Sequence, residues 1–180
     1  RAIREARSEY ILWLDSDDEL SPYLLENYIQ LMQNYPDADV FYCNLIVHNN
    51  ENNELSTLIY KDWNNQENKA LYYAITTASP LPNPGTLIKK DIYKKIGYFN
   101  ENFKRAQDFE FYSRLFLSKK YKVKLLNQFG YIYNIHNSNA TGFITAQTDQ
   151  SYERKVLENI LQNADLEEIF YMLDWENNFY

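Results

Sequence analysis

The sequence predicts an α/β domain, and three observations lead to this expectation. A continuous apolar run, Tyr10 to Leu14, ends abruptly in the carboxylates of Asp15, Asp17 and Asp18. Short apolar runs bounded by polar residues are typical of strands buried on both faces, as in a parallel sheet. Segments whose apolar residues recur at helical spacing then alternate with further mostly apolar runs that resemble strands. Finally, 180 residues with 45% hydrophobic content are enough for one domain with a substantial core.

The first half of the chain is expected to contain two helices and a second strand. Ser21 can cap a helix whose apolar residues recur at helical spacing until Pro36 ends it. Residues 40–47 are mostly apolar and predict a strand, whereas the polar, Asn-rich segment 48–53 predicts a loop. A short helix is expected over residues 69–78.

The second half begins with a loop, because the prolines between Pro80 and Gly85 prevent regular structure. The elements expected after it are, in order, a strand at 86–88, a helix capped by Asp91 and ended by Gly97, a longer helix that begins near Asp108, strands at 123–126 and 131–135, turn-forming residues at 137–142 and a helical tail at 147–180.

The three acids predict a cation site. Ligands of such sheets bind outside the carboxyl ends of the strands, and carboxylates this close repel one another unless a cation or protons intervene. Hard oxygen ligands suit Mg²⁺ or Mn²⁺, and such sites commonly hold a substrate's phosphates as well. The alternative is that Asp17 or Asp18 caps the following helix, which would explain one carboxylate but not three.

Two other acidic motifs fit the same stretch less well. An EF-hand requires glycine where Leu20 stands and a helix where the apolar strand stands, so it is excluded. A haloacid-dehalogenase-type phosphatase also begins with a strand that ends in Asp-x-Asp, usually followed by Gly and Thr. Asp18 and Glu19 occupy those places here. The phosphatase is therefore a poor match and stays as the weaker alternative.

A second acidic segment lies near the start of the long helix. Asp108 is either a catalytic group or a helix cap, and the segment alone leaves both readings open. Arg114 lies one turn from Glu110, which predicts a salt bridge between them. His136 ends the last predicted strand, where it is either a ligand or a structural residue.

The overall composition and charge limit the kinds of partner and the cellular location that we expect. The net charge is −7 and no basic cluster exceeds a pair of lysines, which argues against a nucleic-acid partner. An acidic protein can still bind a nucleotide if a metal supplies positive charge. The single cysteine fits a reducing compartment. No apolar run approaches the ~20 residues of a transmembrane helix. We expect a cytoplasmic protein, with peripheral membrane association as an open alternative.

These pieces together resemble the family 2 inverting glycosyltransferases, which have the nucleotide-sugar-binding GT-A fold. The resemblance rests on three stretches in the family's order, which are residues 6–18 with the Asp-x-Asp signature, residues 84–115 with Gly97-Tyr98-Phe99-Asn100-Glu101 before Asp108, and residues 133–136 with the late histidine. It covers roughly residues 1–142. One departure is Gln107, which stands where the family often has glutamate before its catalytic aspartate.

The resemblance implies a GT-A-like mixed sheet flanked by helices, N-terminally incomplete, within a single domain at 1–180. It also implies metal-dependent, inverting transfer of a sugar from a nucleoside-diphosphate sugar to a saccharide or other hydroxyl acceptor, as in polysaccharide biosynthesis. A non-catalytic binding or scaffold module of the same fold is the alternative.

The site residues implied by the resemblance have separate roles. Asp108 is the expected catalytic base, which takes the proton of the acceptor hydroxyl. The expected Mn²⁺ or Mg²⁺ ligands are Asp15, Asp17 and His136. The expected substrate contacts are Asp15, Asp18, Gln107 and Arg114.

Overall fold

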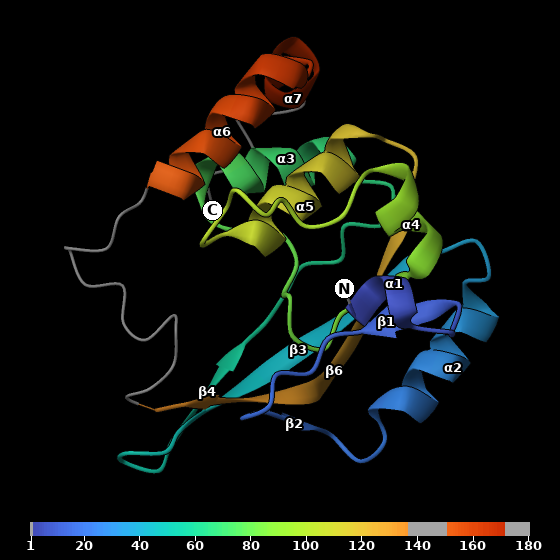
Figure 1. Ribbon diagram of the computed structural model, residues 1–180, viewed down its shortest axis with the longest axis vertical. Coiled ribbons are helices and arrows are strands. Elements are labelled where there is room, and N and C mark those ends of the chain that lie inside the picture. Colours follow the sequence, from blue (N-terminus) through green and yellow to red (C-terminus); the bar gives the residue numbers. More distant parts are fainter. Residues whose placement is uncertain (1, 137–150, 172–180) are drawn as a thin grey trace.

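The computed structural model describes residues 2–136 and 151–171, and these form a mixed sheet with helices on both faces (Figure 1). The strands are β1 (Tyr10–Leu12), β2 (Glu19–Leu20), β3 (Val40–Asn49), β4 (Glu54–Leu58), β5 (Leu87–Lys89) and β6 (Val123–Ile135). The predicted mixed α/β architecture is therefore confirmed.

Three strands of the sheet run in the same direction. The strand order is β1-β5-β3-β6-β2, with β4 paired to the C-terminal half of β3. β5 is antiparallel to both β1 and β3, and β3 is parallel to β6. The carboxyl ends of β1, β3 and β6 consequently point toward one edge of the sheet, which brings residues that follow these strands together.

β1 is less buried than predicted and has an antiparallel neighbour. Its three residues are half-buried rather than buried on both faces, and among the described residues its partner is β5, which runs antiparallel to it. The prediction of a fully buried strand in a parallel sheet was wrong for this element, although its carboxyl end still leads to the acidic residues.

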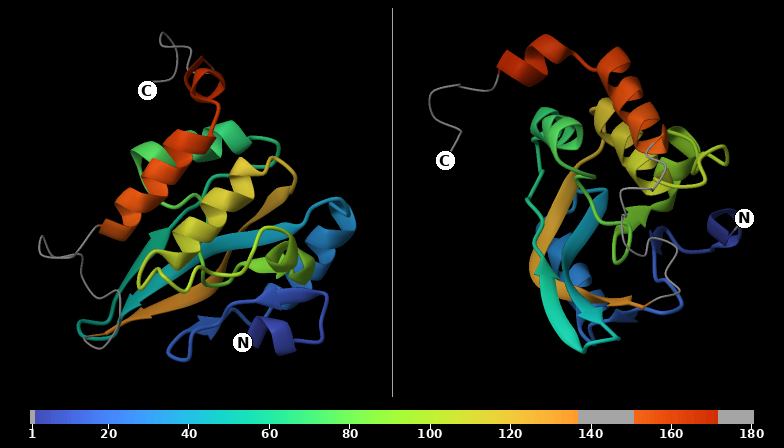
Figure 2. Two further views of the ribbon diagram at one scale, coloured as in Figure 1. Left: turned by 45° about the horizontal axis from the view of Figure 1, so that its top comes forward. Right: turned by 90° about the vertical axis from the view of Figure 1, so that its left-hand side faces the viewer.

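The helices lie on both sides of the sheet. They are α1 (Ala2–Glu5), α2 (Leu24–Asn34), α3 (Glu67–Thr76), α4 (Lys90–Lys95), α5 (Gln107–Leu117), α6 (Ser151–Asn163) and α7 (Leu166–Tyr171). α2 covers one face, whereas α3, α5 and α6 stack over the other (Figure 2). Among the described helices, none has both the length and the apolar character needed to cross a membrane.

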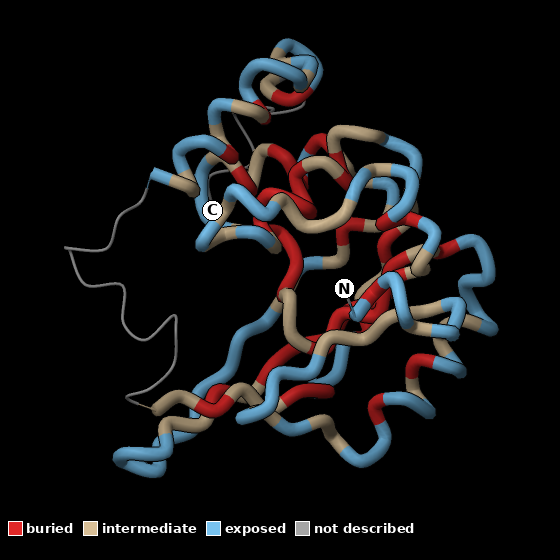
Figure 3. The backbone as a smooth tube through the Cα atoms, in the orientation of Figure 1, coloured by how far each residue is buried: buried red, intermediate tan, exposed pale blue. Residues whose placement is uncertain are grey.

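Two hydrophobic cores share the central strand β3. Alternate residues of a strand point to opposite faces. Val40 and Tyr42 accordingly join the core under α3 and α5, while Phe41 and Cys43 join the core against α2. Buried positions concentrate along β3 and the inner side of α5, while the tip of the β3–β4 hairpin is exposed (Figure 3).

Several helix caps and strand boundaries in the structure differ from the predicted ones. Tyr23, not Ser21, precedes α2 and no side chain caps that helix. Asp91 lies in the first turn of α4 instead of capping it. The two strands predicted at 123–135 are one continuous strand, β6, and the short strands β2 and β4 were not predicted.

Part of the predicted C-terminal region can be compared with the structure. The predicted turn at 137–142, and residues 147–150 and 172–180 of the predicted helical tail, lie outside the described residues. Within the described part of that tail, the structure contains α6 and α7.

Candidate functional site

The residues from Asp15 to Asp18, here called the aspartate turn, are held against β6. One oxygen of the Asp18 carboxylate accepts a hydrogen bond from the Tyr131 hydroxyl at 2.7 Å, and the other accepts one from the Asn134 main-chain N–H at 2.8 Å. Asp18 therefore anchors the turn to a strand and does not cap α2, so the capping alternative was wrong.

Asp17 and His136 meet at the end of β6. His136 is the first residue after the strand, and its Nε2 lies 2.9 Å from Oδ2 of Asp17. The carbonyl oxygen of Asp17 accepts a further hydrogen bond from Nδ2 of Asn134 at 2.8 Å. The structure thus brings together two of the three predicted metal ligands, although they are 119 residues apart in sequence.

Asp15 lies beside this pair. Its main-chain N–H donates to the Tyr131 hydroxyl at 3.2 Å. Partial desolvation raises the pKa of the Asp15 carboxyl, and the charges of Asp18, Asp17 and Asp108 raise it further. This is the repulsion expected for clustered carboxylates, and it shows that Asp108 shares one electrostatic environment with the aspartate turn.

Asp108 is the second residue of α5 and is half-buried. Burial raises the pKa of its carboxyl above the ordinary 3.8, whereas hydrogen bonds from the main chain of Phe109 and of Asp108 itself act in the opposite direction. The charge of Glu153 raises this pKa further. Ala106, with φ of 55°, occupies the N-cap position, so Asp108 does not play the capping role that was its alternative.

The donor set can be compared with what a divalent cation requires. The described residues contain no group of three or more His, Cys, Asp or Glu side chains arranged to hold a metal ion. Adjacent ligands of an octahedral Mg²⁺, each at 2.0–2.1 Å, lie about 2.9 Å apart. The 2.9 Å between Asp17 and His136 is the distance of the hydrogen bond or ion pair that the two side chains make with each other, and it is also short enough for both to bind one cation. Since Mg²⁺ commonly completes its shell with waters and substrate phosphates, the pair fits a cation shared with a phosphorylated substrate.

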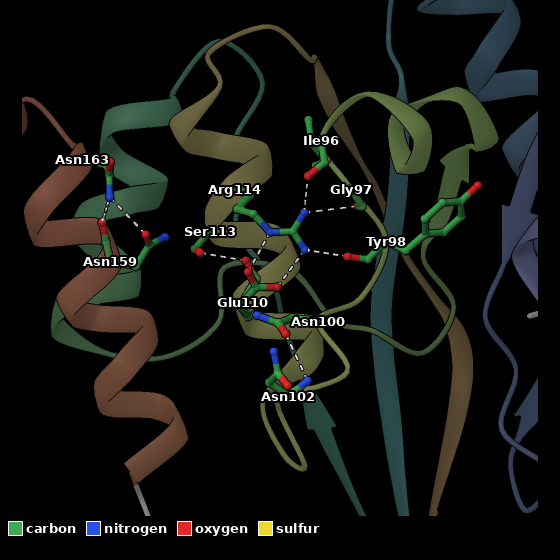
Figure 4. A network of polar contacts seen from close by, with 10 residues as sticks. All are labelled: Ile96, Gly97, Tyr98, Asn100, Asn102, Glu110, Ser113, Arg114, Asn159 and Asn163. Carbon is green, nitrogen blue, oxygen red and sulfur yellow. Dashed lines mark hydrogen bonds and ion pairs between the residues drawn. The ribbon is translucent and has the colours of Figure 1, made fainter.

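Gln107 and Arg114 make their described contacts within the protein. Nε2 of Gln107 donates to the carbonyl of Phe103 at 2.6 Å. The Arg114 guanidinium forms a two-pronged pair with Glu110, with both N–O distances 2.7 Å, and also donates to the main-chain carbonyls of residues 96–98 (Figure 4). The predicted salt bridge to Glu110 is confirmed. Substrate contact by Asp15, Asp18, Gln107 or Arg114 stays a prediction.

Two residues that hold the aspartate turn were not identified from the sequence. Tyr131 is fully buried and Asn134 is 5% exposed, and both belong to β6. The available signal was a polar Asn within the otherwise apolar segment 131–135, because a buried amide requires partners. The sequence does not say which partners these are.

Comparison with known proteins points to sugar transfer. A model of the family described as glycosyl transferase family 2 matches residues 1–97, a stretch that includes the aspartate turn and ends before Asp108 and His136. A curated relative, the uncharacterized glycosyltransferase MJ1057 of Methanocaldococcus jannaschii, is 28% identical over 137 residues. That match covers 76% of this chain and 46% of the relative, so the chain spans about half of its length.

Solved structures with a similar fold include TarS of S. aureus. The chain of TarS residues 1–349 in complex with UDP-GlcNAc superposes with a TM-score of 0.57 at 15% identity, covering 99% of this chain and 53% of that one. A second TarS structure gives a TM-score of 0.55 at 16% identity, covering 90% and 29%. At these identities the likeness shows the fold alone, which is the GT-A arrangement.

Proposed function

Because this chain belongs to glycosyl transferase family 2, we propose that the protein transfers a sugar from a nucleoside-diphosphate donor to an acceptor hydroxyl, with inversion at the anomeric carbon. The observation that carries the proposal is the convergence of the aspartate turn, His136 and Asp108 at one edge of the sheet. Family membership and the GT-A fold also speak against the phosphatase alternative.

Asp108 is assigned as the general base. As the acceptor oxygen attacks the anomeric carbon, Asp108 takes the hydroxyl proton, and the bond from that carbon to the diphosphate breaks on the opposite side. A single displacement of this kind inverts the anomeric configuration and needs no covalent intermediate. The raised pKa of Asp108 strengthens it as a base, since proton affinity rises with pKa.

Asp17 and His136 are assigned to the cation, with Asp15 beside them. When bound, Mn²⁺ or Mg²⁺ would offset the negative charge of the departing diphosphate. Asp18, Tyr131 and Asn134 hold the turn in place so that the Asp17 carboxylate faces His136.

A uridine nucleotide is the donor to test first, because TarS is described in complex with UDP-GlcNAc and with UDP. The protein over its natural length is incubated with Mn²⁺ and a panel of nucleoside-diphosphate sugars, and release of the nucleoside diphosphate is measured with and without a chelator. We expect cation-dependent release with at least one donor. Donor binding without release or transfer to any acceptor would instead indicate a non-catalytic module.

A further inference from the structure

His48 of β3 contacts the network that holds the aspartate turn. Its Nδ1 lies 3.1 Å from Oδ1 of Asn134, and its Nε2 lies 2.9 Å from Oδ1 of Asn53 in the turn of the β3–β4 hairpin. The contact is set by sheet register, because His48 and Asn134 are paired positions of the parallel strands β3 and β6. The His48 nitrogen that contacts Asn134 is therefore Nδ1.

The hydrogen bonds of Asn134 define which group donates. Nδ2 of Asn134 donates to the carbonyl of Asp17, which leaves Oδ1 facing His48. An amide oxygen only accepts hydrogen bonds, so the contact with Asn134 is a hydrogen bond when Nδ1 of His48 carries the hydrogen. Nε2 of His48 also faces an amide oxygen, that of Asn53, and a neutral imidazole can donate to only one of the two. Asn134 is buried, so removing this donor would cost its Oδ1 a hydrogen bond inside the protein.

Resting on the proposed function, we propose that His48 is a positioning residue of the donor site. Its Nδ1–H fixes the side-chain amide of Asn134. That amide holds the Asp17 carbonyl through Nδ2, and the main-chain N–H of the same residue holds the Asp18 carboxylate. Those bonds set the turn so that Asp17 faces His136. His48 itself touches neither member of that pair in the contacts described, and acts through Asn134.

The experiment compares three variants of the protein over its natural length. His48→Leu removes the donor, His48→Asn keeps an N–H donor close to the Nδ1 position, and Asn53→Gly removes only the contact at Nε2. Asn53 has a φ of 58°, a conformation that glycine adopts without strain. Thermal melting of each variant shows whether it is folded.

The first measurement is the binding of Mn²⁺ in the presence of UDP, followed by the electron paramagnetic resonance of free Mn²⁺. We expect binding about 10-fold weaker in His48→Leu, the lower end of the usual effect of losing a residue that orients a metal ligand. His48→Asn and Asn53→Gly should stay within about threefold of the unmodified protein, on the same scale.

The second measurement needs no cation, so it separates this proposal from the proposed function. Hydrogen exchange of the Asn134 main-chain N–H, measured by NMR, should become faster in His48→Leu and stay slow in His48→Asn. If the unmodified protein binds no Mn²⁺, the cation site fails and this exchange result alone decides the role of His48. The positioning role is overturned if His48→Leu exchanges like the unmodified protein, or if His48→Asn is as impaired as His48→Leu.

Discussion

Two opposing effects act on the carboxyl group of Asp108. Its position in the first turn of α5 favours the charged form, because main-chain N–H groups there carry partial positive charge. Burial favours the neutral form, and the pKa is raised above 3.8 because burial is the larger effect. A half-buried carboxyl with raised proton affinity, beside a cluster of other acids, is typical of a functional site rather than of a helix cap.

Asp108→Asn should separate catalysis from binding. Asparagine keeps the size and polarity of the side chain but cannot take the proton, so transfer should fall by roughly 10²–10⁴-fold. The affinity for UDP with Mn²⁺ should change little, because Asp108 is assigned to the acceptor side. Transfer rates and equilibrium binding of UDP are measured on the same preparation. Full-rate transfer by Asp108→Asn would end the assignment of this residue as the base.

The same substitution should stabilise the fold at neutral pH. A raised carboxyl pKa means that the unfolded chain loses its proton first, so stability is lost as the pH rises from 3.8 through the folded-state pKa. Asp108→Asn removes that loss. We expect a higher melting temperature than the unmodified protein at pH 7 and a smaller difference near pH 4.

The control for this effect is Asp91→Asn. Asp91 is an exposed acid whose pKa is lowered by Lys95, so its replacement should not stabilise the protein at pH 7. A lower melting temperature of Asp108→Asn at pH 7 would contradict the burial argument.

At the scale of elements, Arg114 connects α5 to the segment that follows α4. Its guanidinium binds the carboxylate of Glu110, which is 8% exposed, and three carbonyls of residues 96–98. Arg114→Met keeps most of the side-chain volume but leaves Glu110 buried without its partner. We expect unfolding free energy to fall by about 2–4 kcal/mol, which is near the range for breaking a buried ion pair after allowance for partial exposure. Denaturant unfolding measures it.

Lys95→Met provides a matched comparison. Lys95 and Asp91 also form an i,i+4 pair, but both side chains are more than half exposed, so the loss of unfolding free energy should be far smaller than that of Arg114→Met. If Arg114→Met unfolds like the unmodified protein but binds UDP less tightly, Arg114 contacts substrate as the family resemblance implied, and the structural role proposed from its contacts is wrong.

The helices and strands differ in how well their sequences predicted them. α2 was expected from helical spacing and Pro36, which are local signals. The sequence predicted two strands, at 123–126 and 131–135, where the structure has the single strand β6 with residues 127–130 inside it. In the structure they stay in the strand because β3 pairs along its whole length, with register shifts beside Asn44. Gly130 also allows close packing, since a Cβ there would lie 2.4 Å from the Leu24 side chain.

At the scale of the molecule, the candidate site depends on strand direction. The sequence could predict that acids follow an apolar strand and that His136 follows another, because both signals are local. It could not predict that β1 pairs antiparallel with β5, residues 87–89, since no local pattern encodes a partner so distant in sequence. Asp17 and His136 nevertheless lie together as expected, because β1 and β6 run in the same direction although β5 and β3 lie between them. The roles of the two residues stay predictions.

The negative charge of the whole chain affects how a nucleotide can bind. The net charge is −7, and the site itself gathers Asp15, Asp17, Asp18 and Asp108. A nucleoside diphosphate adds further negative charge, so it should bind weakly unless a cation offsets the repulsion. A ligand that binds only the folded state raises its stability by about 2.7 kcal/mol at 100 times its Kd.

We therefore expect UDP with Mn²⁺ to raise the melting temperature by several degrees, whereas UDP with a chelator should have little effect. Asp17→Asn removes a charge from the proposed cation site, so most of the Mn²⁺-dependent shift should be lost. Asp108→Asn should retain the shift, because its carboxyl is assigned to proton transfer rather than to the cation. Differential scanning fluorimetry of the three proteins measures all of these shifts. An equal rise with UDP in the presence of a chelator would show that the nucleotide binds without a cation, and the roles proposed for Asp17 and His136 would then be wrong.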